Sequence, residues 1–86
     1  MALLITPGTT AATSADFTLA SGESTTLYLS GSYDHTCFAT VLVRTSSGSY
    51  PVAYLSGNDP LKVVVGAGTF AVERHAGAVS FGVDRD

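Results

Sequence analysis

Two histidines are the side chains of this sequence best suited to acid–base chemistry. His35 directly follows Asp34, and His75 stands two residues after Glu73. Nucleophilic catalysis needs a nucleophile, a base and a group that orients the base. Neighbouring side chains of an extended segment point apart, so Asp34 is not expected to orient His35. Glu73 and His75 would share one face of a strand, which predicts a solvated pair with no catalytic role.

The other reactive side chains also fail to form a recognisable site. Cys37 is the single cysteine, which excludes a disulfide within one chain, and it opens an apolar run where a buried thiol acts as a small hydrophobic group. One cysteine and two distant histidines do not supply the four ligands of a structural zinc ion. The seven acidic residues give no identifiable carboxylate pair of the kind that hydrolyses glycosides. The sequence therefore predicts no enzyme, no metal ion and no cofactor.

Charge and hydropathy exclude two classes of partner. The net charge is −3, and the four basic residues are spread along the chain, so no basic patch is present to neutralise phosphates. No apolar run approaches the roughly 20 residues that span a bilayer. The N-terminal segment also lacks the basic start of a signal peptide. We therefore expect a soluble protein made in the cytoplasm, with neither nucleic acid nor membrane as its partner.

Short segments of alternating apolar and polar residues fill the chain from Asp16 onward, as expected of half-buried β-strands. Turns rich in Gly, Ser, Asn, Asp or Pro separate seven such segments. They span residues 16–20, 25–30, 36–45, 50–55, 61–65, 70–75 and 79–84. Strands with turns every 8–12 residues are typical of a β-sandwich or small barrel. The predicted fold is all-β, with about seven mostly antiparallel strands in a single domain over residues 16–86.

Several residues predict where individual strands lie. Residues 36–45 are apolar on both faces, which indicates a central strand covered on both sides. Ser46–Ser49 is a turn that closes a hairpin, and Pro51 predicts that the strand after this turn lies at a sheet edge or is unpaired on the side of the missing N–H. Residues 69–86 are expected to form a terminal β-hairpin. The alternation places these residues in the core: Val41, Val43, Val52, Val63, Val65, Phe70, Val72, Phe81 and Val83.

Residues 1–15 differ from the rest of the chain. Leu3, Leu4 and Ile5 form a short apolar patch, and the segment that follows consists of small residues. One interpretation is a frayed tail. The other is an extended arm whose apolar tip docks on a neighbouring molecule. A domain of 86 residues is only marginally stable as a monomer, and with disulfides excluded, oligomerisation is the expected stabiliser.

Four tyrosines are candidates for contacts with a partner: Tyr28, Tyr33, Tyr50 and Tyr54. Amphipathic tyrosines are common at subunit interfaces and at the edges of sheets. They could also line a surface that binds carbohydrate. Together with the N-terminal patch, the predicted partner-binding residues are Leu3, Leu4, Ile5, Tyr28, Tyr50 and Tyr54.

Two segments carry a resemblance to a known group of proteins. Phe17–Leu29 is a strand, a Gly-Glu turn and a strand, and Gly68–Asp84 holds the expected terminal hairpin. Together they resemble the small β-rich virion proteins of tailed bacteriophages, the capsid decoration (cement) proteins and head-fibre-base domains. The resemblance implies a non-enzymatic structural protein at the capsid surface of the virion. It would bind the major capsid protein and associate with itself, with a trimer favoured.

Two alternatives from other classes remain. A carbohydrate- or host-receptor-binding β-module of a phage fibre or similar assembly would show an exposed cluster of the four tyrosines. A small hydrolase or metal protein would need His35, His75 and an acid to converge.

Overall fold

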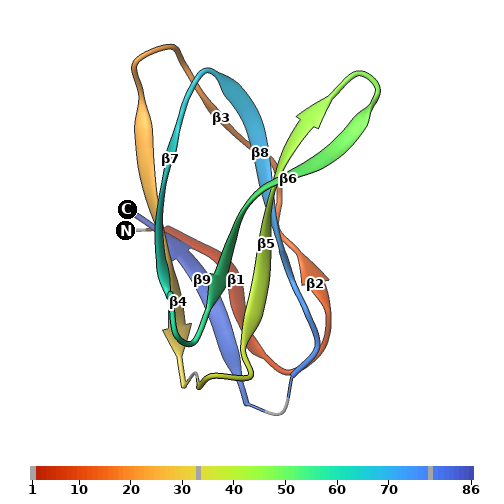
Figure 1. Cartoon of the computed structure of the whole chain (residues 1–86), viewed down its shortest axis with the longest axis vertical. Helices are drawn as coiled ribbons and strands as arrows, with labels where there is room; N and C mark the ends of the chain where they lie inside the picture. The colour runs from red at the N-terminus through yellow and green to blue at the C-terminus, as the bar shows by residue number, and fades with distance from the viewer. Residues whose placement is uncertain (1, 33, 78) are drawn as a thin grey trace.

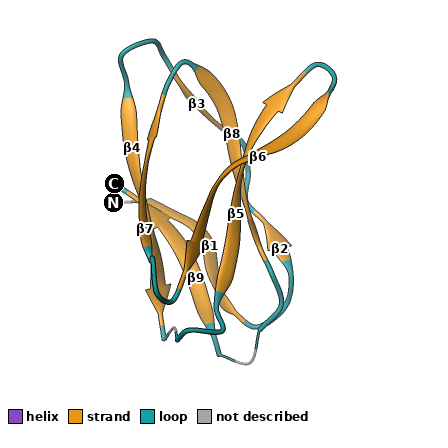
Figure 2. Ribbon diagram, viewed as in Figure 1, coloured by secondary structure: helices purple, strands orange, loops and turns teal. Residues whose placement is uncertain are grey.

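The computed structural model describes residues 2–32, 34–77 and 79–86. Within these ranges the chain forms nine strands in two antiparallel sheets, which pack face to face as a β-sandwich (Figures 1 and 2). The all-β prediction is confirmed, and the seven predicted strands correspond to β3–β9. Over the same ranges no helix is long and apolar enough to cross a membrane.

The first sheet has four strands in the order β1-β9-β4-β7. These are β1 (Ala2–Gly8), β9 (Phe81–Arg85), β4 (Ser24–Gly31) and β7 (Leu61–Val65), and every neighbouring pair is antiparallel. The last strand of the chain, β9, therefore lies inside this sheet between the first strand, β1, and β4, and the outer edges of the sheet are β1 and β7.

The second sheet has five strands. Four of them lie side by side in the order β2 (Ala12–Thr13), β8 (Gly68–Arg74), β5 (Phe38–Thr45) and β6 (Gly48–Ser56). The fifth, β3 (Phe17–Leu19), also pairs with β8. β5 and β6 form the predicted hairpin, and β6 lies at the sheet edge as Pro51 indicated. β5 is central, as predicted. Its outer face is not covered by a third layer, however, because Phe38 there is exposed.

The core lies between the two sheets and draws on both. Of the predicted core residues, five are buried: Val41, Phe70, Val72, Phe81 and Val83. Val43 is partly buried against them. Leu27 and Leu29 from β4 and Leu55 from β6 complete the interior as large buried aliphatic side chains.

Three predicted core residues are instead exposed: Val52, Val63 and Val65. On β7 the inward residue is Val64, so the alternation there runs one position out of the expected phase. On β6 the register with β5 shifts, because Val41 pairs with Ala53 and Leu42 pairs with Pro51. Val52 is the extra residue of this bulge and has no opposite partner.

The expected terminal hairpin is wrong. β8 belongs to the second sheet and β9 to the first, so the segment between them crosses from one sheet to the other. Both strands alternate as predicted, but alternation reports which face is buried and not which strand is the neighbour. β9 pairs instead with β1 and β4.

The N-terminal segment is part of the fold and not a separate arm. β1 pairs with β9 through Ala2↔Arg85, Leu3↔Asp84 and Ile5↔Val83, and Ile5 is buried in the core. β2 pairs with β8. Gly82 permits the close approach of β1, because a Cβ there would lie 2.2 Å from the carbonyl oxygen of Ile5. The two ends of the described chain are consequently neighbours, as Figure 1 shows.

Arg74 connects the N-terminal region to the sandwich through hydrogen bonds. Its side chain is buried, and its Nε donates to the carbonyl oxygen of Thr10 at 2.8 Å. Its Nη1 donates to the carbonyl oxygens of Thr6 at 2.6 Å and Phe81 at 2.9 Å. Three backbone acceptors therefore take the place of a carboxylate around this buried charge.

Candidate functional site

The residues with catalytic potential occupy structural positions. His75 Nε2 lies 2.9 Å from Thr40 Oγ1, and its ring packs against Phe38 with a centroid distance of 5.0 Å. His35 is exposed in a turn, and Cys37 is a buried free thiol. Across the part of the chain that the structure describes, no cluster of three or more His, Cys, Asp or Glu could hold a metal ion.

Asp34 organises the loop before β5. Its carboxylate accepts hydrogen bonds from the Thr36 hydroxyl at 2.5 Å and the Thr36 backbone N–H at 2.8 Å. These bonds hold the pKa of Asp34 below its ordinary range, the hydroxyl contributing most. The backbone N–H of Asp34 in turn lies 3.3 Å from Cys37 Sγ. The hydrogen bonds that the Asp34 carboxylate accepts from Thr36 therefore stay within this loop.

The predicted N-terminal contact residues separate into two kinds. Leu3 is 56% exposed on the outer face of β1, Leu4 is partly buried against the core, and Ile5 is buried. Ile5 is therefore a core residue and is not accessible to a partner. Leu3 is the one member of the patch with a large exposed surface.

The predicted tyrosines are not gathered into one surface. Tyr28 lies on β4 in the first sheet, whereas Tyr50 and Tyr54 lie on β6 in the second. Opposite residues of neighbouring strands share a face. Tyr50 pairs with Val43 and Tyr54 with Thr40, so the bulge between them places these two tyrosines on different faces. Tyr33 lies outside the described residues.

The ring of Tyr54 belongs to a short row of aromatic side chains on the second sheet. Tyr54 and Phe38 stack with centroids 5.4 Å apart and an interplanar angle of 22°. His75 packs against Phe38 from the next strand. The three rings form a row across the sheet, with Phe38 stacked on Tyr54 and tilted against His75.

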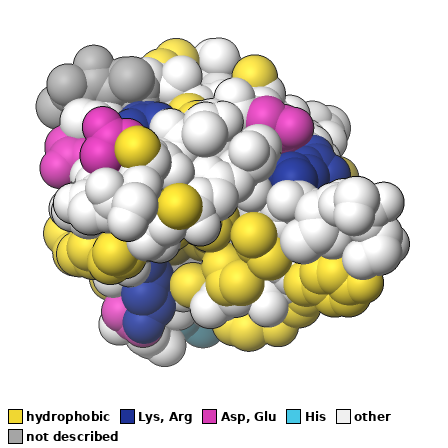
Figure 3. Space-filling model, turned by 90° about the horizontal axis from the view of Figure 1, so that it is seen from above, with side chains coloured by type: hydrophobic (Ala, Val, Ile, Leu, Met, Phe, Trp, Pro, Cys, Tyr) yellow, Lys and Arg dark blue, Asp and Glu magenta, His cyan; other side chains and the backbone are white. Residues whose placement is uncertain are grey.

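The accessible apolar surface lies instead along the edge strands β6 and β7. Six large hydrophobic side chains there are between 48% and 63% exposed, one of them Tyr50 near the start of β6. We call the other five the apolar rim: Val52, Tyr54, Leu61, Val63 and Val65. Seen end-on in Figure 3, hydrophobic side chains gather toward the lower side of the view, with basic side chains next to them. Alternation in the sequence identified these strands but assigned their valines to the core.

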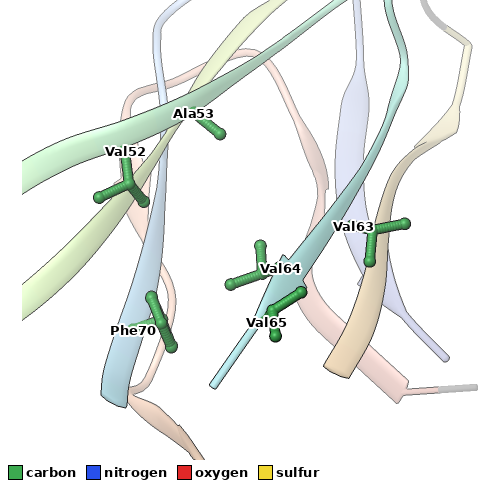
Figure 4. A pocket seen from close by; sticks show the side chains of 6 residues that line it. All are labelled: Val52, Ala53, Val63, Val64, Val65 and Phe70. Carbon is green, nitrogen blue, oxygen red and sulfur yellow. The ribbon is translucent and has the colours of Figure 1, made fainter. Parts of the chain in front are cut away.

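A groove separates β6 from β7 behind this rim. It has a volume of about 250 Å³, and Figure 4 shows Val64 of β7 and Phe70 of β8 directed into the gap. The residues that line it all have apolar side chains: Val52, Ala53, Val63, Val64, Val65 and Phe70. β6 and β7 are edge strands of different sheets and do not pair along the groove, so the sandwich is open on this side.

Comparison with known proteins connects this architecture to a phage-derived structure. No protein-family model and no curated protein matches the sequence. The crystal structure of the SPBc2 prophage-derived protein YomS matches with a TM-score of 0.74, over 96% of this chain and 86% of that chain. The chain has the fold of a prophage protein. Sequence identity over the match is 10%, so the likeness is one of fold.

Proposed function

We propose that this chain is a non-enzymatic structural protein of a phage particle that binds the outer surface of the capsid and stabilises it. The observation that carries the proposal is the apolar rim beside an open groove. A contiguous apolar surface on a small soluble domain is typical of a site for another protein. The fold shared with a prophage-derived protein supports a phage setting.

The proposed partner is the major capsid protein, and the proposed location is the capsid surface of the virion. A capsid presents many copies of its subunit, so a homo-oligomer of this chain would attach through several contacts at once. Such multivalency converts weak single contacts into stable attachment. A trimer is the favoured oligomer, and sedimentation velocity of the purified protein measures its mass directly.

The test is binding to capsids of the encoding phage from which this protein is absent. The purified protein is mixed with the capsids, and the pellet is quantified after ultracentrifugation. We expect saturable binding in a fixed ratio to capsid subunits and a higher capsid melting temperature. An unrelated acidic β-domain of similar size serves as the control. Absence of binding by the intact protein would overturn the proposal.

A further inference from the structure

We propose that β7 accepts an extended segment of the capsid protein as an additional strand in the gap between β6 and β7, with an apolar side chain seated over Phe70. This inference rests on the proposed function and identifies the surface that would carry it. The occupant is a polypeptide because the edge of β7 presents a row of backbone groups as well as apolar side chains.

The gap begins where a β-ladder stops. Ser56 and Asp59 exchange two backbone hydrogen bonds, of 3.1 Å and 3.0 Å, across the turn that joins β6 to β7. Beyond this pair the strands diverge, and β6 and β7 are not neighbours in either sheet. The groove opens between them and is lined by residues of both. Each strand therefore turns one edge toward the gap.

The register shows which backbone groups face the gap. The N–H of Leu29 bonds to the carbonyl of Pro60, and the N–H of Gly66 bonds to that of Glu23, at the two ends of the β4–β7 pairing. Hydrogen-bonded pairs alternate along antiparallel strands, so residues 62 and 64 bond to β4. Leu61, Val63 and Val65 then direct their N–H and C=O groups away from β4 and toward β6.

The other sheet edges are less suited to strand addition. β1 contains Pro7 and has two register shifts, and β6 contains Pro51 and a bulge. β2 and β3 are two and three residues long. Prolines, bulges and shortness are the usual means of blocking an edge. β7 has neither a proline nor a bulge and pairs with β4 in unbroken register. A lysine can also protect an edge, but Lys62 of β7 is held by its ion pair with Asp59, so β7 is the edge best suited to a partner strand.

The groove selects an apolar side chain. Its volume of about 250 Å³ is below the roughly 300–1,000 Å³ of pockets that bury a drug-sized molecule, and no polar side chain lines it. The nearest charged group on β7, Lys62, is paired with Asp59 at 2.5 Å. A strand with small or medium apolar residues at alternate positions would form hydrogen bonds with the backbone groups of β7 that face the gap. Its apolar side chains would pack against the apolar side chains of the groove.

A second copy of the chain fits the gap less well than a separate segment does. Each described strand of this protein is already paired within its own sheet, so a donated strand would bring that sheet with it. The gap is closed at one end by the Ser56–Asp59 pair, so a strand would enter it from the open end. A terminal or loop segment that is not already paired would bring no such sheet with it.

The test compares capsid binding by the intact protein, Val63→Pro and Val63→Lys. Proline removes the N–H that faces the gap without breaking a bond to β4, and lysine places a charge on the exposed outer face. Thr13→Lys, which adds the same charge to the exposed edge strand β2, is the matched control. We expect at least a tenfold loss of affinity for both Val63 variants and a change of less than twofold for Thr13→Lys. Circular dichroism and melting temperature establish that each variant is folded.

The outcomes separate this inference from the proposed function. Loss of binding by both folded Val63 variants, with an unchanged oligomeric mass, supports the inference. Intact protein and both Val63 variants binding equally would overturn it and leave capsid binding in place. A Val63→Pro protein that loses self-association shows that a second copy occupies the edge, and this also overturns it. Failure of the intact protein to bind overturns the proposed function, and with it the partner assigned to β7.

Discussion

Arg74 shows how a single polar side chain can fix the position of a whole segment. Its guanidinium bonds to carbonyl oxygens of Thr6, Thr10 and Phe81, and its Cζ lies 5.9 Å from the centroid of the Phe81 ring. These acceptors come from the N-terminal region and from β9. The side chain therefore joins parts of the chain that are more than 60 residues apart in sequence.

Replacing Arg74 with methionine should destabilise the fold by about 3 kcal/mol, because the buried carbonyl oxygen of Phe81 and the part-buried ones of Thr6 and Thr10 lose a charged donor. The free energy of unfolding, measured by urea denaturation, tests this expectation. Arg44→Met is the matched control, since Arg44 forms a partly exposed ion pair with Asp16 at 3.1 Å. Its loss should cost less than about 1 kcal/mol. Equal effects of the two substitutions would contradict the role assigned to Arg74.

Two exposed carboxylates should make the stability fall in acid. The backbone N–H of Thr26 and then the Thr25 hydroxyl lower the pKa of Asp86, and the bonds from Thr36 lower the pKa of Asp34. A lowered folded-state pKa means that the unfolded chain binds protons more readily. The stabilisation is therefore complete above about pH 4, the range of an unfolded aspartate, and is lost as the pH falls through the folded-state pKa values.

Thermal melts between pH 6 and pH 2.5 test this expectation. The melting temperature of the intact protein should fall below about pH 4. Asp34→Asn with Asp86→Asn should melt lower than the intact protein at pH 6 and show a shallower decrease in acid. An identical pH profile for the double variant would show that these two carboxylates do not set the acid response.

At the scale of elements, β1 contributes to the core and not only to the surface. Ile5→Ala should destabilise the protein by about 2–4 kcal/mol, because it leaves a cavity next to Val83. Leu3→Ala, on the exposed face of the same strand, should change stability by less than about 0.5 kcal/mol. Chemical denaturation of both variants measures the difference. Similar small effects would show that β1 is detached in solution, as the arm interpretation required.

The strands themselves were predictable because alternation directly reports burial of one face. The predicted strand over residues 61–65 coincides with β7. Three consecutive valines do not show which of them points inward, because all three are equally apolar. The buried Val64 could therefore not be distinguished from the exposed Val63 and Val65. The β6 bulge also left no clear sequence signal beyond Pro51. The apolar rim was missed for these two reasons.

Neighbour relations were the harder part to predict. Short turns favour hairpins, and this holds for β5 and β6, but β8 and β9 cross between sheets although few residues join them. Nor does alternation show that Arg74 is buried, because its partners are backbone carbonyls, which every residue possesses. The crossing from β8 to β9 and the burial of Arg74 both follow from the long-range pairing of β1 with β9. A local sequence pattern carries no information about this pairing.

At the scale of the whole molecule, the neighbouring ends predict that the chain tolerates a circular rearrangement. A variant with residue 86 joined to residue 2 by a short glycine linker, and new ends opened at Ser46–Ser47 in the β5–β6 turn, should keep its β-sheet circular dichroism. Exposed turns are the sites where such openings succeed. Its melting temperature should lie within about 10 °C of that of the original chain, since no core contact is cut. A variant that does not fold would contradict the adjacency of Ala2 and Arg85.

The pairing of β1 with β9 also determines when the molecule can fold during its synthesis. β9 lies between β1 and β4 in the first sheet, so this sheet lacks its central strand until residues 81–85 have left the ribosome. Until then β1 and β4 have unpaired edges, and Ile5 and Leu27 lack the strand against which they pack. Sheets built from distant strands form slowly, because the chain must be ordered before the contacts are gained. The first sheet should therefore form only after residues 81–85 have emerged, and the nascent protein is most prone to aggregation just before that point.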